Sequence, residues 1–235
     1  MNLPINQIIC GDCLEVMKTF PDKSVDLVLT DPPYGTTNED WDSTEWLKTA
    51  WNELDRVCNG NFIMMASQPF TTDLINSNRG NFKYCWVWNK EIQGNPLLAK
   101  FQPLKIHEDI VVFGKGKYFP IMENGKFRKK GGGKSKLWNV PNPYYESDKY
   151  FPKSIITFNN SNRLNLQHPT QKPIDLMAYL IKTYSNENDI ILDPFLGSGT
   201  TAVAAKQLHR RYIGIEISQK YCDIAKARLG QEVLF

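Results

Sequence analysis

The 235-residue chain is predicted to be an α/β protein built on a mostly parallel, doubly wound sheet. Along most of its length, short apolar and β-branched runs alternate with segments of helical periodicity, the pattern of strand–helix–strand units. Acidic residues follow several of these runs directly, at the strand ends where such sheets bind ligands. Only residues 114–165, which are basic and rich in glycine, depart from the pattern, and they are predicted to form an insertion.

The composition excludes several classes of protein. Hydrophobic residues make up 41% of the chain and charged residues 23%, with a net charge of +3, as in ordinary soluble globular proteins. No apolar run approaches the ~18 residues of a membrane span, and no secretion signal opens the chain, so a cytoplasmic location is expected. The five cysteines are expected to be reduced. Cys10 and Cys13 lack a second ligand pair, so no metal is expected.

The first half of the chain is predicted to hold five strands, each an apolar run between turn residues. The strand that begins the series stops at Gly11, and the helix after it ends at Pro21, because proline cannot continue a helix. Strands are expected at residues 7–10, 25–30, 61–66, 82–88 and 107–113, with helices at 14–20, 44–57 and 69–76. Ser43 or Thr44 is expected to cap the second of these helices, which ends near Asn59.

The last third returns to the alternating pattern. Two strands are expected, at residues 189–192 and 211–215, and three helices, at 173–181, 200–208 and 218–229. Pro173 is suited to open the first of these helices, and Ser218 to cap the last. The expected total is therefore seven strands.

The strand at 25–30 ends at Asp31-Pro32-Pro33-Tyr34. Each proline fixes its own φ and removes a backbone donor, so the exit from the strand is predicted to be a stiff loop. A carboxylate, the carbonyl of Pro32 and an aromatic ring together suit a flat ring that bears an amine, since two acceptors meet the NH₂ group and one face stacks. The alternative is a strand that simply ends at prolines, with a capping Asp31.

A second candidate site begins at Asp193, at the end of the strand before the alanine-rich helix. Its sequence runs from Asp193 to Thr201 as D-P-F-L-G-S-G-T-T. Glycines there allow a ligand to approach the backbone, and the helix N-terminus offers free N–H groups. Glu216 ends the next strand, where a carboxylate suits the hydroxyls of a ribose. A nucleoside-bearing ligand is therefore predicted, with a purely structural glycine turn as the alternative.

The insertion at 114–165 combines basic, glycine and aromatic residues. That combination is typical of a surface that follows a nucleic-acid backbone, and a solvated surface insertion is the alternative. The candidate DNA-binding residues are Lys115, Lys117, Lys126, Arg128, Lys129, Lys130, Lys134 and Lys136.

Together these motifs resemble the beta class of DNA amino-methyltransferases, which use S-adenosylmethionine. Asp31 to Tyr34 resembles the catalytic motif of that family, and Asp193 to Thr201 its cofactor motif. His168 to Pro173 is similar to the segment before the cofactor motif, and Gly11 to Glu15 to the family's start. In the beta class the order is circularly permuted: the catalytic half comes first, a recognition region follows, and the cofactor half is last. This chain has that order.

The resemblance implies a Rossmann-like, seven-stranded methyltransferase sheet with two functional parts. Residues 1–113 and 166–235 would form the catalytic and cofactor-binding domain, and residues 114–165 the target-recognition insertion. The implied reaction is methylation of adenine N6 in double-stranded DNA, at a base that is flipped out of the duplex. A homodimer and a cognate restriction nuclease are possible partners within this family.

The resemblance also implies the role of each site residue. Catalysis would rest on Asp31, Pro32, Pro33 and Tyr34. The cofactor would contact Asp12, Cys13, Asp31, Thr170, Lys172, Asp193, Phe195, Gly197, Ser198, Gly199, Thr200 and Glu216. Among these, Glu216 would bind the ribose, and Thr170 and Lys172 would reach the methionine carboxylate.

Three alternatives to adenine methylation stay open at this point. Cytosine N4 carries the same kind of amine, although Asp rather than Ser at position 31 favours adenine in this family. A DNA-binding regulator without catalysis is a second alternative, which the intact catalytic and cofactor motifs argue against. Methylation of a protein or an RNA is the third.

Overall fold

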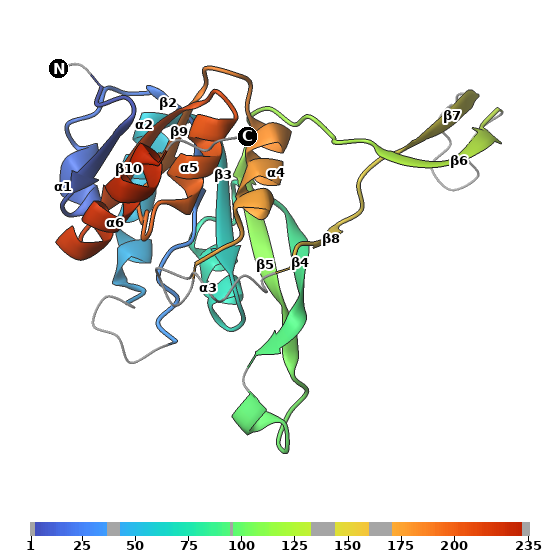
Figure 1. The fold of residues 1–235 in the computed structure, drawn as a ribbon, viewed down its shortest axis with the longest axis horizontal. Coiled ribbons are helices and arrows are strands. Elements are labelled where there is room, and N and C mark those ends of the chain that lie inside the picture. The colour runs from blue at the N-terminus through green and yellow to red at the C-terminus, as the bar shows by residue number, and fades with distance from the viewer. Residues whose placement is uncertain (1–2, 37–42, 95, 133–143, 160–170, 232–235) are drawn as a thin grey trace. The chain divides into compact units, whose positions relative to one another are not determined.

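The computed structural model describes residues 3–36, 43–94, 96–132, 144–159 and 171–231. The chain forms two compact units (Figure 1). One contains residues 1–119 and 154–235, and the other contains residues 120–153. The predicted insertion, 114–165, is wider than the second unit, because its two ends belong to the first.

The first unit is built on an eight-stranded sheet in the order β1-β10-β9-β2-β3-β5-β4-β8. The strands are β1 Gln7–Cys10, β2 Val25–Thr30, β3 Cys58–Ala66, β4 Phe82–Gly94, β5 Lys105–Gly114, β8 Ile155–Thr157, β9 Ile190–Asp193 and β10 Arg211–Glu216. Neighbouring strands are parallel except for β5, which is antiparallel to both β3 and β4. The mostly parallel α/β sheet with seven predicted strands is thus confirmed, and β8 adds a three-residue strand at one edge.

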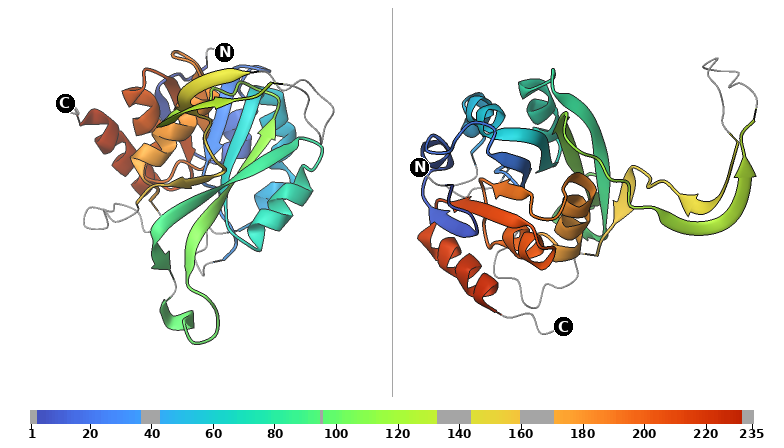
Figure 2. Two further views of the ribbon diagram at one scale, coloured as in Figure 1. Left: turned by 90° about the vertical axis from the view of Figure 1, so that its right-hand side faces the viewer. Right: turned by 90° about the horizontal axis from the view of Figure 1, so that it is seen from above.

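Helices cover both faces of this sheet, as Figure 2 shows. They are α1 Cys13–Met17, α2 Ala50–Val57, α3 Phe70–Ser77, α4 Ile174–Tyr184, α5 Thr200–Gln207 and α6 Gln219–Gly230. The first three helices pack with Val28 of β2, whereas α4 and α5 pack with its neighbours Leu27 and Leu29. Alternate side chains of the same strand therefore build two separate cores, as a doubly wound sheet requires. In the described parts of the chain, no helix is long and apolar enough to cross a bilayer.

The predicted helix at 44–57 is divided in two. A 3-10 helix, η1 (Glu45–Lys48), precedes α2, and the backbone leaves the helical region at Thr49, where φ is −121°. Thr44 makes no capping bond with its side chain, whereas the Ser43 hydroxyl accepts a bond from the Glu45 N–H at 3.3 Å. The expected single capped helix is therefore wrong for this stretch.

Two other local predictions also fail. Ser218 lies at the N-cap position of α6 but makes no capping bond with its side chain, and its backbone N–H donates to the Glu216 carboxylate at 2.9 Å. Asn59 lies inside β3 rather than in a turn after α2. The neighbouring Gly60 passes so close to the Asp26 carbonyl that a Cβ would lie 1.8 Å from its oxygen. This glycine therefore serves strand pairing, not a chain reversal.

The second unit contains an antiparallel pair of strands, β6 (Glu123–Lys130) and β7 (Tyr145–Tyr150). The Arg128 guanidinium lies 3.7 Å from the centre of the Tyr150 ring, a close cation–π contact. A Cβ at Gly125 would lie 2.5 Å from the same ring, so this glycine leaves room for the tyrosine. No strand was predicted here, because glycine and lysine dominate the sequence.

Candidate active site

Four acidic residues lie at one edge of the sheet. Asp12 follows β1, Glu216 ends β10, Asp193 ends β9, and Asp31 follows β2. These four strands are adjacent and parallel, so all four side chains belong to the same carboxyl edge. The two predicted sites are therefore neighbours in space, although Asp31 and Asp193 are far apart in the sequence.

The Asp31 carboxylate is held by two side chains. The Tyr34 hydroxyl donates to Oδ1 at 2.7 Å, and the Lys172 ammonium donates to Oδ2 at 2.6 Å. Burial and the charge of Asp31 raise the pKa of Tyr34 well above its ordinary value, so the phenol keeps its proton and acts as the donor. The polar end of the loop is thus arranged around an acceptor carboxylate.

Two aromatic residues from helices hold the rest of the loop. The Tyr34 ring stacks on Phe70 of α3, with ring centroids 5.0 Å apart and planes at 16°. The Trp46 indole N–H donates to the Pro33 carbonyl at 3.2 Å, and its ring lies 5.0 Å from that of Phe195. Trp46 therefore connects the loop after β2 with the loop after β9.

Lys172 is 7% exposed and lies between two carboxylates. Besides Asp31, its ammonium lies 3.5 Å from Glu108 on β5, and Lys90 on β4 reaches the other oxygen of Glu108 at 3.0 Å. Burial alone would lower the pKa of Lys172, but Asp31 and Glu108 raise it to about 12. Burial would likewise raise the pKa of Glu108, but Lys172 and Lys90 lower it. Lys172 and Glu108 therefore stay charged at neutral pH.

This network bears on the predicted cofactor contacts before α4. Lys172 was expected to reach the methionine carboxylate of the cofactor. In the structure its ammonium donates to Asp31, and the cofactor contact stays a prediction. Thr170, the other residue expected to do so, lies outside the described residues.

Asp193 is buried, with 3% of its surface exposed. Its Oδ1 accepts bonds from the Thr30 hydroxyl at 2.6 Å and from the Phe195 N–H at 3.1 Å. Burial raises the pKa of Asp193 to about 6, although these bonds and one with Thr201 oppose the shift. A buried carboxylate with neutral partners is suited to a cationic ligand group.

The glycine loop after β9 is fixed from two sides. Glu216 accepts a bond from the Gly197 N–H at 2.8 Å through Oε2. From α6, Arg228 donates to the Ser198 carbonyl at 2.6 Å and to the Thr200 hydroxyl at 3.2 Å. The hydroxyls of Ser198 and Thr200, both predicted to bind cofactor, thus point to Arg228.

Asp12 and Cys13 lie at the start of α1, next to this loop. Asp12 Oδ1 accepts bonds from the N–H groups of Leu14 and Glu15 at 2.8 and 3.1 Å, so it caps the helix. Gly11 donates to the Glu216 carbonyl at 2.9 Å, which ties this turn to the end of β10. Burial raises the pKa of the Cys13 thiol to about 12, so it is not a thiolate nucleophile. Among the described residues, no cluster of His, Cys, Asp and Glu could hold a metal ion.

The predicted DNA-binding residues are divided between the two units. Lys115 and Lys117 are exposed on the first unit, where Lys117 pairs with Asp189 at 2.7 Å. On the second unit, Lys126 is exposed, Arg128 covers Tyr150, and Lys129 pairs with Glu146 at 3.0 Å. Lys134, Lys136 and the side chain of Lys130 lie outside the described residues.

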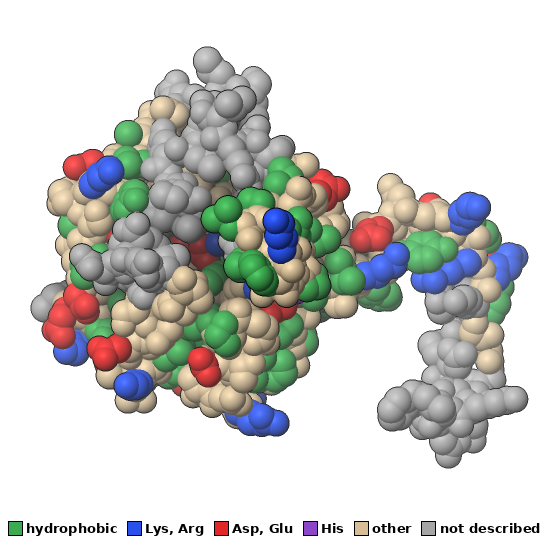
Figure 3. All heavy atoms as spheres, turned by 90° about the horizontal axis from the view of Figure 1, so that it is seen from below, with side chains coloured by type: hydrophobic (Ala, Val, Ile, Leu, Met, Phe, Trp, Pro, Cys, Tyr) green, Lys and Arg blue, Asp and Glu red, His purple; other side chains and the backbone are tan. Residues whose placement is uncertain are grey.

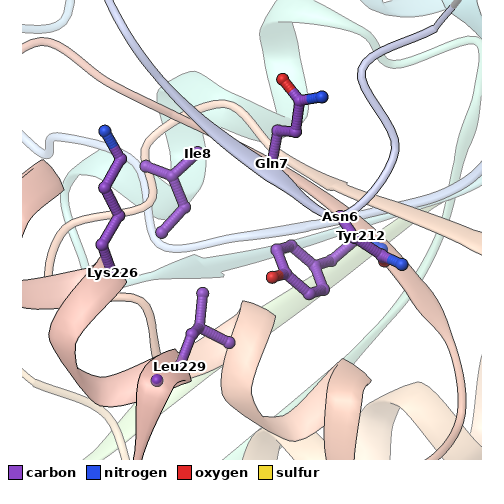
Figure 4. Close-up of a pocket in the computed structure, with 7 residues that line it drawn as sticks. Asn6, Gln7, Ile8, Tyr212, Lys226 and Leu229 are labelled. Carbon is purple, nitrogen blue, oxygen red and sulfur yellow. The ribbon is translucent and has the colours of Figure 1, made fainter.

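A separate hollow lies at the opposite end of the strands (Figure 4). It is lined by Asn6, Gln7, Ile8, Tyr212, Lys226, Leu229 and Gly230, from the starts of β1 and β10 and the end of α6. None of the predicted site residues lines it, so it has no part in the arrangement above.

The chain is similar to DNA methyltransferases over nearly its whole length. A family model described as DNA methylase, of the N6/N4 type, matches residues 25–227. The type II methyltransferase M.HpaI of Haemophilus parainfluenzae is 30% identical over 248 residues, covering 96% of this chain and 74% of that protein. M1.MboII of Moraxella bovis is 29% identical over 263 residues, covering 97% of this chain and 98% of that protein.

Solved structures show the same fold. A complex of M1.HpyAVI with SAM, 28% identical, has a TM-score of 0.67 and covers 96% of this chain and 99% of that one. The PvuII methyltransferase, named as cytosine-N4-specific, has a TM-score of 0.71 at 17% identity, covering 97% of this chain and 87% of that one. At that identity the likeness concerns the fold alone.

Proposed function

Since this chain belongs to the DNA methylase family, we propose that it transfers a methyl group from S-adenosylmethionine to the N6 amine of adenine in double-stranded DNA. The class is beta, and the methyl donor is S-adenosylmethionine. Adenine as the target is the proposal. The observation that supports adenine is the position of Asp31. This acceptor carboxylate lies beside Tyr34, at the sheet edge where Asp193 also lies.

The residues of the carboxyl edge fit this cofactor in their chemistry. Asp193, a buried carboxylate bonded to neutral donors, suits the ammonium of a methionine group. Glu216 uses one lone pair of each oxygen for a backbone N–H, which leaves acceptors for the hydroxyls of a ribose. Asp12 and Cys13 would meet the adenine ring, and Phe195, Gly197 and Gly199 the methionine end.

The proposed chemistry depends on how Asp31 orients the amine. The lone pair of an adenine amine is delocalised into the ring, which makes it a poor nucleophile. Asp31 and the Pro32 carbonyl would accept its two N–H bonds and favour a tetrahedral nitrogen. The cofactor supplies an electrophilic methyl group when bound. Asp31 would also accept the proton that the methylated nitrogen must lose, since its carboxylate would already hold one N–H of that amine.

Tyr34 can keep its bond to Asp31 during this step. Its hydroxyl uses one lone pair of Asp31 Oδ1, which leaves another for an N–H of the substrate amine. Lys172, on the other oxygen, can stay in place. A flipped base stacked on the Tyr34 ring would gain about 1–3 kcal/mol, against an unstacking cost of a few kcal/mol.

A methylation assay on unmethylated bacterial genomic DNA tests the proposal, with modified bases read by single-molecule sequencing. N6-methyladenine at one short motif is expected. Asp31→Ala should abolish it while S-adenosylmethionine still binds, and Asp73→Ala, on the exposed side of α3, is the matched control. N4-methylcytosine would refute adenine as the target. A protein that binds the cofactor but modifies no base would refute DNA methylation.

The partners of the enzyme are also a proposal. M.HpaI and M1.MboII are named as type II methyltransferases, so a cognate restriction nuclease is the class of partner that we propose. A homodimer would be detected by light scattering of the purified protein.

A further inference from the structure

The hairpin between β4 and β5 runs beyond the sheet on the side of the active site. β4 lies parallel to β2 through the chain of pairings β2-β3-β5-β4, so its end and the start of β5 reach the same edge as Asp31. Trp88 is the last fully buried residue of β4. The hairpin continues from Asn89 to the short helix η2 (Pro96–Leu98) at its far end (Figure 1).

The tip of this hairpin presents large apolar side chains to solvent. Leu97 is 91% exposed and Phe101 84%. Leu98, Leu104 and Ile106 are also exposed. Figure 3 looks onto this side of the molecule, where hydrophobic side chains gather with lysine or arginine. Single exposed apolar residues are common, whereas a group of five on one tip marks an interaction surface.

The tip is folded rather than frayed. The Ala99 N–H donates to the Pro96 carbonyl at 3.2 Å, and the N–H groups of Phe101 and Gln102 donate to the Leu98 carbonyl at 2.9 and 3.0 Å. These bonds fix the turn that directs Leu97 and Phe101 outward. A rigid apolar tip pays little conformational entropy when it binds.

The charge of the tip favours an anionic partner. From Pro96 to Ile106 the charged residues are Lys100 and Lys105, and no acidic residue lies among them. Lys105 is bonded to Ser67, and Lys100 is exposed. Apolar groups flanked by cations, with no acid among them, suit a duplex, where stacked bases lie between phosphates.

The base of the hairpin is connected to Asp31 through the buried Lys172. Lys90 on β4 and Glu108 on β5 pair at 3.0 Å, and Glu108 lies 3.5 Å from Lys172, the partner of Asp31. These ion pairs fix the direction of the hairpin relative to Asp31. A duplex whose flipped base reaches Asp31 would therefore lie on the same side of the molecule as the hairpin tip.

We propose that the β4–β5 tip is a wedge that enters the DNA duplex beside the target base, with Leu97 and Phe101 occupying the space that the flipped base leaves and Lys100 meeting a phosphate. The proposal rests on DNA methylation as the proposed function. Apolar side chains inserted between base steps are an established way of keeping a duplex open. A second copy of the chain, covering the tip in a dimer, is the competing occupant.

The test compares Leu97→Ser/Phe101→Ser with the apolar-preserving control Leu97→Met/Phe101→Leu. Each protein is assayed on the same genomic fragments as duplex and after heat denaturation. The serine variant should lose about tenfold or more in kcat/KM on duplex DNA, equivalent to about 1.4 kcal/mol, and much less on denatured DNA, where no base pair has to open. The control variant should retain the wild-type ratio.

Three results would overturn the wedge. They are an equal loss on both substrates, no loss on either, and a wild-type dimer that becomes monomeric in the serine variant, which would assign the tip to a second copy. The melting temperature and the affinity for S-adenosylmethionine should not change, since both side chains are exposed. Failure of the wild-type protein to methylate DNA would instead refute the proposed function itself.

Discussion

At the scale of single residues, Lys172 has the least usual surroundings. A buried ammonium costs several kcal/mol unless carboxylates compensate it, and here Asp31 and Glu108 do so. The arrangement explains how an acidic loop can stand at a sheet edge that already carries three other carboxylates. It also supports a role for Lys172 that acts through Asp31, beside the predicted contact with the cofactor.

Replacement of Lys172 by Gln should separate these two roles. The variant leaves Asp31 without its counter-charge, so kcat is expected to fall at least about tenfold while the dissociation constant for S-adenosylmethionine stays within about twofold. Loss of one partner from the buried network should also lower the free energy of unfolding by about 3 kcal/mol. Lys182→Gln, exposed on α4, is the control. Weaker binding of S-adenosylmethionine with an unchanged kcat would contradict a role through Asp31 and support the predicted contact of Lys172 with the methionine carboxylate.

Asp193 should make the stability of the ligand-free protein depend on pH. Its folded pKa of about 6 lies above the ordinary 3.8, so between these values the native state holds more protons than the unfolded state. The free energy of unfolding contributed by this group therefore falls as pH rises from about 4 to 6, by on the order of 2–3 kcal/mol, and stays low above that range.

Asp193→Asn should remove this decline. The amide oxygen can still accept from Thr30 and Phe195, which both bond to Oδ1, and no charge is buried. Urea denaturation at pH 5 and pH 8 measures the free energy of unfolding of both proteins. At pH 8 the variant is expected to be more stable relative to the wild type than at pH 5. It should also lose affinity for S-adenosylmethionine. An equal pH dependence in both proteins would contradict the shifted pKa.

The sequence located the site residues that follow strands and missed those that act from elsewhere. Asp31, Asp193 and Glu216 were identifiable because each lies at the end of an apolar run, and parallel strands bring such ends together. Arg228 could not be found, since its contact with the loop depends on how α6 packs. Glu108 did leave a signal, because an acidic residue in a buried strand needs a partner. Trp46 was not identified as a site residue, because the sequence places it only within the expected helix at 44–57.

At the scale of elements, the glycine loop before α5 shows how a turn restricts its sequence. Gly199 has φ of +88°, and a Cβ there would lie 2.7 Å from the Ala225 Cβ of α6. Gly197 has φ of +54° and no atom within 4 Å of such a Cβ. Both positions favour glycine because φ is positive. Only at Gly199 would a side chain also collide with a neighbouring residue.

Two alanine substitutions should separate these effects. Gly197→Ala is expected to lower the free energy of unfolding by about 1 kcal/mol, the cost of a left-handed residue. Gly199→Ala adds an overlap with the fixed Ala225 and should cost about 2–4 kcal/mol in total. Urea unfolding of both variants measures the difference. Equal losses would mean that α6 moves away at no cost, and the close contact would then have no role.

The strands that the sequence missed lack a strong signal of their own. In β6 and β7, within the segment rich in glycine and lysine, neither apolar alternation nor a β-branched run marks a strand. β8 is a β-branched run, but it is only three residues long. Conversely, the predicted helix at 44–57 was too long, because a helical spacing of apolar residues also suits η1 followed by α2. The periodicity of apolar residues therefore predicted the core helices and strands correctly. It failed where a strand or a turn forms because of contacts with other parts of the chain.

At the scale of the whole molecule, the circular permutation is reflected in the sheet order. β1 pairs with β10, and β2 with β9, so the first and last parts of the chain interleave at the carboxyl edge. The loop at Asp31, proposed to be catalytic, comes from the first part, and the loop at Asp193, proposed to bind the cofactor, comes from the last. The predicted order of motifs and the doubly wound sheet are therefore consistent with each other. The two loops come together because strands far apart in the sequence pair with each other.

The division into units leads to a prediction for the whole chain. Replacing residues 120–153 with a short Gly-Ser linker removes the second unit and leaves both ends in the first unit, where Ser154 accepts a bond from the Val87 N–H at 2.8 Å. Because the two cores and all four acidic residues of the carboxyl edge belong to the first unit, the shortened protein should fold and bind S-adenosylmethionine like the wild type. Its methylation of duplex DNA should fall by at least about a hundredfold, since basic residues proposed to hold phosphates are lost.

Calorimetry with S-adenosylmethionine and the methylation assay measure the two properties separately. Loss of cofactor binding would show that the second unit supports the fold of the first. Methylation at the wild-type rate and at the same motif would show that residues 120–153 have no part in target recognition, and the exposed surface of the first unit would then have to recognise DNA alone. Intact cofactor binding with lost methylation is the result that a recognition insertion requires.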